Sequence, residues 1–200
     1  MLRCFENDNI THVDGSIDPV RDKGIIDTEL QLKDLETIEN RLAKTQKQAV
    51  VGGDKQAKRA VEILLQYKAV LEQGLSARTV ELEKEDRKLV ADLNLLTDKP
   101  VLYVCNVDEK SAVTGNEHTR AVEAAIADER AEMLIVAAAT EADIAELDEY
   151  EERQMFLEEI GLKESGVARL IKAAYKLLDL QTFFTTGADE SRAWTFRRGM

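Results

Sequence analysis

Two short runs made only of apolar residues, at 101–105 and 133–137, constrain the fold of this 200-residue chain more than any other feature. The first run follows Pro100, and a segment with helical spacing, in which Val122 and Ile126 share a face, separates the two runs. Apolar runs of this length are typical of strands that are covered on both faces. A strand, a helix and another strand in this order predict a right-handed crossover within a parallel sheet. The expected fold class is therefore α/β.

The predicted sheet is small, because only residues 2–5 offer a further strand beside the two apolar runs. Doubly wound sheets usually hold about five or more strands, so we expect an incomplete sheet. Near the end of the chain, strand-forming residues at 182–186 and 193–196 flank a polar turn and predict a β-hairpin. A hairpin alone is marginally stable in water, which indicates that a second domain begins there.

The middle of the chain, residues 21–99, predicts helices. Apolar side chains recur there at intervals of three and four residues, as one face of a helix requires. The stripe before Gly52 and Gly53 consists of Leu35, Ile38, Leu42, Thr45 and Ala49, and the stripe after them of Ala57, Ala60, Leu64, Tyr67 and Leu71. Because glycine favours a turn over a helix interior, this pattern predicts two antiparallel helices joined at the glycines, with Asp54 capping the second.

Three further helices are expected, at 83–96, 152–160 and 166–178. In the first of these, the spacing predicts that Leu89, Leu93 and Leu96 lie on the inner face. A run at 141–152 holds seven acidic residues in 12 and is most simply a solvated face.

The composition excludes several classes of function. A net charge of −12 argues against a protein that covers its whole surface with nucleic acid, and no apolar stretch approaches the roughly 20 residues of a membrane helix. Cys4 and Cys105 lie inside apolar runs, as is typical of buried thiols in the reducing cytoplasm. The two histidines and two cysteines contain no closely spaced ligand pair, so we predict no metal site. No arrangement of Ser, His and Asp, or of Cys and His, predicts a catalytic residue.

Polar residues follow the first apolar run, at the point where ligands bind in open α/β sheets. The amide of Asn106 can hydrogen-bond a nucleotide base, and the carboxylate of Glu109, three positions on, can accept from an exocyclic amine. The alternative is a turn that caps the helix that follows. Ala137 and Ala138, at the end of the second run, would let a flat base approach the backbone, and here the alternative is close packing.

Two histidines and one basic segment complete the candidates. His12 lies in a polar loop, where it would orient a water, pair with a phosphate charge or simply be solvated. We interpret His118 as part of a helix cap.

Residues 41–59 carry six basic side chains against the single acid Asp54, a net charge of +5. The six are Arg41, Lys44, Lys47, Lys55, Lys58 and Arg59. This basic tip predicts contact with RNA phosphates, and the alternative is a solvated helix end.

Several motifs occur together in one order along nearly the whole chain. They are RCFENDNI at 3–10, TEL at 28–30, DLE at 34–36, GGD at 52–54, NVDE at 106–109, EADIAEL at 141–147, AYKLL at 174–178, LQTFFT at 180–185 and RAWT at 192–195. This order resembles the YchF and Obg-like ATPases. That family consists of P-loop NTPases with a GTPase-like fold, an inserted helical coiled coil and a C-terminal TGS domain.

The resemblance implies four segments. Residues 1–20 would be a strand and loop of the GTPase-like domain, 21–99 the coiled-coil insertion, 100–178 the second half of the GTPase-like domain, and 179–200 the start of the TGS domain. The fold is then a partial P-loop NTPase sheet with an inserted antiparallel coiled-coil hairpin, ending in the first β-hairpin of the TGS domain.

The resemblance also implies a nucleotide site. Asn106 and Val107 would lie at the adenine, Glu109 would replace the aspartate that selects guanine in GTPases, and Ala137 and Ala138 would form the base-facing end of the next strand. ATP is therefore the expected nucleotide. Contact of the basic tip with the ribosome or RNA is expected as well.

The sequence contains no Gly-x-x-x-x-Gly-Lys-Ser/Thr, the loop that cradles phosphates, so the Mg²⁺ ligands are expected to lie outside this chain. We expect the intact parent to be a cytoplasmic ATP hydrolase that acts as a switch on the ribosome or RNA. The 200-residue chain alone is expected to be inactive. The alternative is a nucleotide-independent RNA- or protein-binding module that uses the basic helical hairpin. The oligomeric state is left open.

Overall fold

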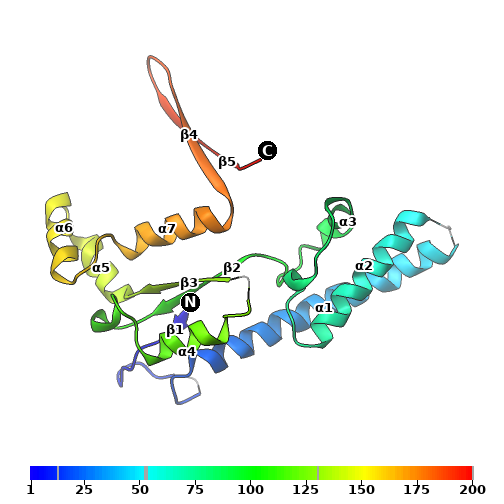
Figure 1. Ribbon diagram of the computed structural model, residues 1–200, viewed down its shortest axis with the longest axis horizontal. Helices are drawn as coiled ribbons and strands as arrows, with labels where there is room; N and C mark the ends of the chain where they lie inside the picture. The colour runs from blue at the N-terminus through cyan, green and yellow to red at the C-terminus, as the bar shows by residue number, and fades with distance from the viewer. Residues whose placement is uncertain (13, 52–53, 130, 200) are drawn as a thin grey trace. The chain divides into compact units, whose positions relative to one another are not determined.

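The structure, a computed structural model, describes residues 1–12, 14–51, 54–129 and 131–199. The chain forms two compact units, of which one comprises Met1–Asp22 with Val101–Met200 and the other Lys23–Pro100 (Figure 1). The predicted turn at Gly52 and Gly53 lies outside the described residues. In the described ranges, no helix is both long enough and apolar enough to cross a membrane.

The first unit is built on a parallel sheet of three strands, β1 (Leu2–Arg3), β2 (Val101–Asn106) and β3 (Ala131–Val136), in that order. Leu2 pairs with Cys105, and Tyr103 with Met133. The α/β class with a parallel sheet is thus confirmed. The second strand was expected to extend through residue 137, but it ends at Val136, and Ala137 occupies the N-cap position of the helix that follows.

Helices lie on both sides of this sheet, α4 (Glu117–Ala125) on one and α7 (Gly166–Leu177) on the other (Figure 1). The core on the α4 side consists of Cys4, Cys105, Val107, Ala112, Val122, Ile126 and Ala137. Val122 is fully buried, as the periodicity of this helix predicts. On α7, by contrast, Val167 and Ile171 remain more than half exposed.

The sequence analysis missed α5 (Ala138–Glu146), which begins directly after β3 and precedes α6 (Tyr150–Glu159). Part of the acidic run therefore forms a helix. Glu141 is not merely solvated, because its carboxylate accepts hydrogen bonds from the backbone N–H groups of Gly166 (2.6 Å) and Val167 (3.2 Å). It caps the N-terminus of α7, where unpaired N–H groups favour a negative charge.

The predicted hairpin consists of the antiparallel strands β4 (Leu180–Thr186) and β5 (Ser191–Arg197). Its apolar side chains are exposed: Phe184 by 73% and Trp194 by 47%. Phe183 and Phe196 pack edge to face with ring centroids 5.8 Å apart. The assignment of this hairpin to a TGS domain stays a prediction.

The second unit contains most of α1 (Pro19–Val51), α2 (Lys55–Glu72) and α3 (Lys84–Val90), with the 3₁₀ turns η1 (Ala77–Thr79) and η2 (Ala91–Leu93). Helices α1 and α2 run side by side (Figure 1). Side chains of both stripes share one core, among them Ile38, Leu42, Leu64 and Tyr67, and Ile63, which lies outside the predicted stripe, joins it. The cap by Asp54 is confirmed, because its carboxylate accepts from the N–H of Gln56 at 2.8 Å. A coiled coil in the strict sense stays a prediction.

The helix predicted at 83–96 is wrong in its extent. Helical structure ends at Leu93, and Asn94 takes a left-handed conformation with φ of 49°. Leu96 is 42% exposed, whereas Leu95 is buried. The cause is Asp34 on α1, whose carboxylate accepts at 2.7 Å from the backbone N–H groups of Leu96 and Thr97 and from the Thr97 hydroxyl. These bonds hold the chain out of the helical path.

Candidate nucleotide-base site and basic tip

Asn106 joins the ends of all three strands of the sheet. Its side-chain Oδ1 accepts a hydrogen bond from the N–H of Ala138 at 3.0 Å, immediately beyond β3. Its backbone carbonyl accepts from the N–H of Cys4 at 2.7 Å, immediately beyond β1. The two strand ends that the sequence analysis singled out are therefore brought together by a direct bond.

This bond fixes the orientation of the amide. Because the N–H of Ala138 needs an acceptor, the oxygen of the Asn106 side chain faces it, and the NH₂ group faces the other way. Among the described residues, that NH₂ group has no hydrogen-bond partner. It remains able to donate to an acceptor atom of a ligand bound beyond the strand ends.

The loop after Asn106 folds into the 3₁₀ turn η3 (Glu109–Ser111). Asp108 caps it, accepting from the N–H of Ser111 at 2.9 Å, so a capped turn does form here. Glu109 is exposed, and its carboxylate makes no hydrogen bond or ion pair within the described ranges. A capped turn and a carboxylate that contacts a base are thus compatible, because Asp108 makes the cap and leaves Glu109 unengaged.

Val107 and Ala137 are both only 4% exposed and belong to the core beneath the loop. Their side chains pack in this core, and the expectation that these two positions lie at a base stays a prediction. Ala138 is half-buried, so a base at these strand ends would meet the backbone of Val107 and Ala137 and not their side chains. Close packing is therefore the role that the structure gives these side chains.

The two cysteines lie directly under this loop and are fully buried, as predicted. A hydrogen bond between the two thiols, together with burial, raises the pKa of Cys4, and the same bond lowers the pKa of Cys105. Because burial in an apolar core hinders access to a thiol, we assign them to core packing.

His12 is engaged by its neighbours, which the sequence did not reveal. Its Nδ1 accepts from the N–H of Asp14 at 3.2 Å, so the proton lies on Nε2, which faces the carboxylate of Asp22 at 3.0 Å. Arg21 also contacts Asp22, at 3.1 Å. Although ligand atoms of His12, Asp14 and Asp22 lie within 4.8 Å of one another, a protonated Nε2 and an adjacent guanidinium do not suit a metal ion.

His118 does not form the cap of α4. The cap is Asn116, whose Oδ1 accepts from the N–H of Thr119 at 3.1 Å, while the Thr119 hydroxyl accepts from the N–H of Asn116 at 2.9 Å. His118 instead lies 3.5 Å from the carboxylate of Glu6.

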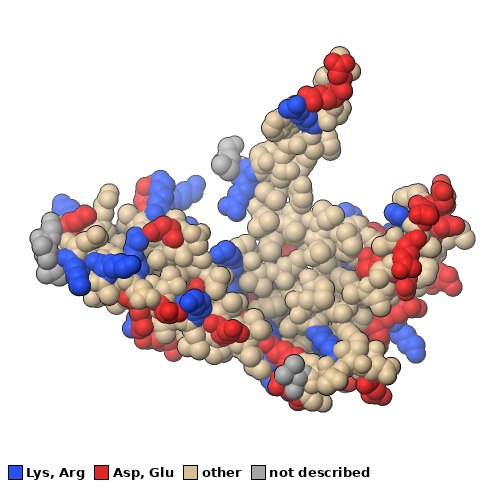
Figure 2. All heavy atoms as spheres, turned by 180° about the vertical axis from the view of Figure 1, so that it is seen from behind, with Lys and Arg blue, Asp and Glu red and all other residues tan. Residues whose placement is uncertain are grey.

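The basic tip of the α1–α2 hairpin divides into paired and unpaired cations. Arg41 pairs with Asp92 at 2.8 Å, and Arg59 pairs with Asp86 at 2.6 Å and Glu62 at 2.7 Å. Four lysines are exposed and make no ion pair in the part of the chain that the structure describes: Lys44, Lys47, Lys55 and Lys58. Figure 2 shows basic side chains gathered around this end of the hairpin. The unpaired charge of the tip is thus carried by lysines.

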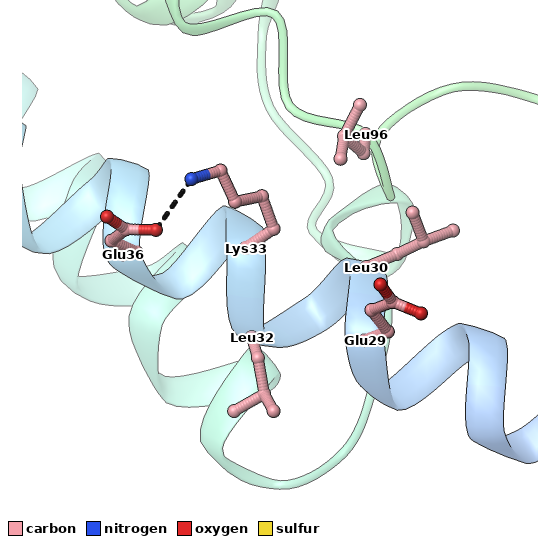
Figure 3. A pocket seen from close by; sticks show the side chains of 6 residues that line it. All are labelled: Glu29, Leu30, Leu32, Lys33, Glu36 and Leu96. Atoms are coloured by element: carbon pink, nitrogen blue, oxygen red, sulfur yellow. Dashed lines mark hydrogen bonds and ion pairs between the residues drawn. The ribbon is translucent and has the colours of Figure 1, made fainter.

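A cavity of about 380 Å³ lies beside α1 in the second unit (Figure 3). It is lined by Glu29, Leu30, Leu32, Lys33, Glu36 and Leu96. Lys33 and Glu36 pair with each other at 2.7 Å, and this hydrogen bond lowers the pKa of Glu36. Glu29 is then the only other charged side chain in the lining, and one carboxylate does not make a convergent set of ligand-binding groups. This cavity is therefore not our candidate site.

Open α/β sheets bind ligands outside the carboxyl ends of their strands, and the Asn106 amide lies at that edge. No protein-family model matches the chain. The chain is 49% identical over 202 residues to the ribosome-binding ATPase YchF of Bacillus subtilis and 45% over 199 residues to that of Escherichia coli O157:H7. It is 40% identical over 205 residues to the Obg-like ATPase 1 of Rattus norvegicus.

Each of these alignments covers 100% of this chain but only 55, 54 and 51% of the respective relative. The solved structure of the Schizosaccharomyces pombe YchF GTPase superposes with a TM-score of 0.87 at 28% identity, covering 100% of this chain and 54% of that one. The resemblance to the YchF and Obg-like ATPases is therefore confirmed over the whole chain. The chain spans about half the length of the relatives that it matches.

Proposed function

We propose that this chain supplies the base-binding half of an ATP site in a P-loop ATPase of the YchF/Obg-like type. The observation that carries the proposal is the bond between the Asn106 side chain and the N–H of Ala138, which holds two strand ends together and leaves an amide donor free. Residues 1–20 and 100–178 are assigned to the GTPase-like domain, 21–99 to the helical insertion and 179–200 to the start of a TGS domain.

The preference for ATP is proposed to arise at Glu109. In GTPases an aspartate at this position selects guanine, and glutamate is one methylene longer. The added length moves the carboxylate away from the place where it would accept two hydrogen bonds from guanine. An exposed carboxylate remains free to accept from the exocyclic amine of adenine.

The residues of this chain fit the base of the nucleotide but not its phosphates. A phosphate-cradling motif, with its lysine and hydroxyl, is absent from the 200 residues. Mg²⁺, when bound in the parent protein, would neutralise charge on the transferred phosphoryl group. We propose that its ligands come from outside this chain and that the chain alone does not hydrolyse ATP.

Amide chemical shifts of the ¹⁵N-labelled chain, measured during titration with ATP or GTP, test the base site directly. We expect ATP to shift the side-chain NH₂ of Asn106 and the backbone amides of Glu109 and Ala138, and GTP to shift them less. Asn106→Ala should abolish these shifts. Equal responses to both nucleotides, or shifts confined to other elements, would refute the assignment.

Glu109→Asp tests selectivity and should narrow the difference between the amide shifts that ATP and GTP cause. The guanine-selecting lysine of GTPases cannot be added at Val107, because a lysine there would be buried in the core. Glu117→Asp, an exposed glutamate shortened in the same way on α4, is the matched control and should leave the difference unchanged. A change of the same size in both variants would show that the preference for ATP does not arise at Glu109.

The second part of the proposal is that the basic tip contacts ribosomal RNA, so that the parent ATPase acts as a switch there. Its support is the set of four exposed, unpaired lysines, and the bacterial relatives named above are called ribosome-binding. The alternative function, an RNA- or protein-binding module independent of nucleotide, rests on the same lysines. The two differ in whether ATP changes the affinity for RNA.

Binding of a labelled RNA hairpin at several salt concentrations tests the tip. Lys47→Glu with Lys55→Glu should weaken binding and reduce the salt slope by about two, because each lysine on a phosphate contributes about one. Lys110→Glu with Lys163→Glu changes the same charge at exposed positions of the other unit and should leave the slope unchanged. Equal losses in the two double variants would show that only net charge matters.

A further inference from the structure

The surface of α6 carries an open cavity of about 610 Å³ in the first unit. It is lined by Leu147, Glu152, Met155, Phe156, Glu158 and Glu159, which we call the α6 groove. Met155 is 70% exposed, while Phe156 is half-buried beside it. The groove thus presents apolar side chains to solvent between carboxylates.

The charge around the groove is strongly one-sided. Residues 141–164 contain ten acidic and two basic side chains, a net charge of −8. One of the two, Arg153, directs its Nε to the carbonyl of Leu147 at 2.7 Å, which fastens the start of α6 to the preceding loop. Figure 2 shows acidic side chains concentrated over α5 and α6. The three groove glutamates make no ion pair among the described residues.

A merely solvated acidic face would not require an exposed methionine among its carboxylates. The thioether of Met155 is flexible and polarizable, so it can pack against apolar side chains of several shapes. The surrounding carboxylates repel phosphates and attract cations, which disfavours nucleic acid and favours a basic partner. Apolar and electrostatic features of the groove therefore point to the same occupant.

We propose that the α6 groove binds a basic protein segment in which a bulky apolar side chain is flanked by lysines or arginines. The apolar side chain packs against Met155 and Phe156, and the flanking cations face Glu152, Glu158 and Glu159. This interaction is separate from the nucleotide site and from the basic tip, so it stands or falls independently of the proposed function.

Fluorescence anisotropy of a labelled ten-residue peptide, one tryptophan flanked by lysines, tests the proposal with the whole chain. Glu158→Gln with Glu159→Gln should weaken binding about fivefold, as expected for the loss of two exposed charge pairs. Glu123→Gln with Asp128→Asn removes the same charge from exposed positions on α4 and in the turn that follows it, and should change binding less than about twofold. Equal losses in the two variants would overturn the proposal, since net charge alone would explain them.

The apolar part of the groove has its own controls. Met155→Ser should weaken binding about tenfold, because a methionine side chain would lose its buried contact. Tyr150→Ser, on the same helix, 69% exposed and not lining the groove, should have little effect. A peptide with glycine in place of tryptophan should bind at least about tenfold more weakly. Equal binding of that peptide would overturn the proposal, as would self-association of the chain that Met155→Ser abolishes.

Discussion

Asp34 gives the sharpest test of how the second unit is held together. This carboxylate lies on α1, is 2% exposed, and accepts three hydrogen bonds of 2.7 Å from Leu96 and Thr97. The hydroxyl of Thr97 in turn accepts from the N–H of Ala77 at 3.0 Å, so one side chain organises α1, η1 and the segment after η2. Asp34→Ala would leave three donors without their acceptor in a buried place.

The magnitude follows from those three bonds. A hydrogen bond to a charged group contributes about 1.5–3 kcal/mol, and a buried donor left unsatisfied costs about 1–3 kcal/mol. Because water and local rearrangement recover part of the loss, we expect Asp34→Ala to destabilise by about 3–5 kcal/mol. Asp34→Asn keeps one acceptor oxygen and should cost less, about 1–3 kcal/mol. Against a typical total of about 5–15 kcal/mol, either loss is easily measured.

Urea unfolding followed by circular dichroism provides the free energies, and hydrogen exchange provides the location. The amides of Leu96 and Thr97 should exchange faster in Asp34→Ala. Asp92→Asn is the control, because it removes an exposed carboxylate paired with Arg41 and should cost less than about 1 kcal/mol. If Asp34→Ala costs no more than Asp92→Asn, the buried bonds do not hold this unit together and the reasoning fails.

Three further predictions concern a core leucine, the cap of a helix and a titrating group. Leu64→Ala should cost about 2–5 kcal/mol in urea unfolding, because this side chain is fully buried; a loss below about 1 kcal/mol would contradict its central place in the core. Glu141→Gln should lower the melting temperature of the chain through a loss of about 1 kcal/mol at the N-terminus of α7, and an unchanged melting temperature would refute the cap. Burial raises the pKa of Asp98, so its carboxyl favours folding while protonated and loses that contribution as the pH rises through the folded-state pKa. Asp98→Asn should therefore stabilise the chain at about pH 7 but not at about pH 3 in urea unfolding; destabilisation at about pH 7 would show that the ion pair with Arg87 outweighs burial.

Local patterns predicted the elements of this fold well. The 3-4 spacing of Ile38, Leu42, Leu64 and Tyr67 identified side chains that the structure buries in one core. The two apolar runs became neighbouring parallel strands, and Asn106 was recognised at the correct strand end. Such features depend on nearest neighbours in the sequence, which is why periodicity and turn residues revealed them.

The misses share a different cause. The early end of the helix predicted at 83–96 depends on Asp34, more than 60 residues earlier in the chain. Helix α5 was missed because it lies in a run whose acidity resembled a solvated face. Likewise, nothing in the local sequence shows that Arg41 finds Asp92 or that Val107 turns into the core. Except for α5, these outcomes are decided by partners distant in sequence, so spacing alone could not predict them.

The same distinction bears on how the two charged surfaces are interpreted. Counted along the sequence, the tip holds six cations, but the fold pairs both arginines with carboxylates, one on η2 and one on α3, and leaves the lysines unpaired. Arginine forms planar, multiply bonded contacts that fasten structural elements together, whereas lysine is a compact, strongly hydrated point charge that stays in solvent more readily. At α6, too, the fold directs Arg153 into a backbone contact and leaves the glutamates unpaired. In both places arginine is used within the fold, so the unpaired lysines and glutamates, and not the net charge of a segment, define the surfaces available to partners.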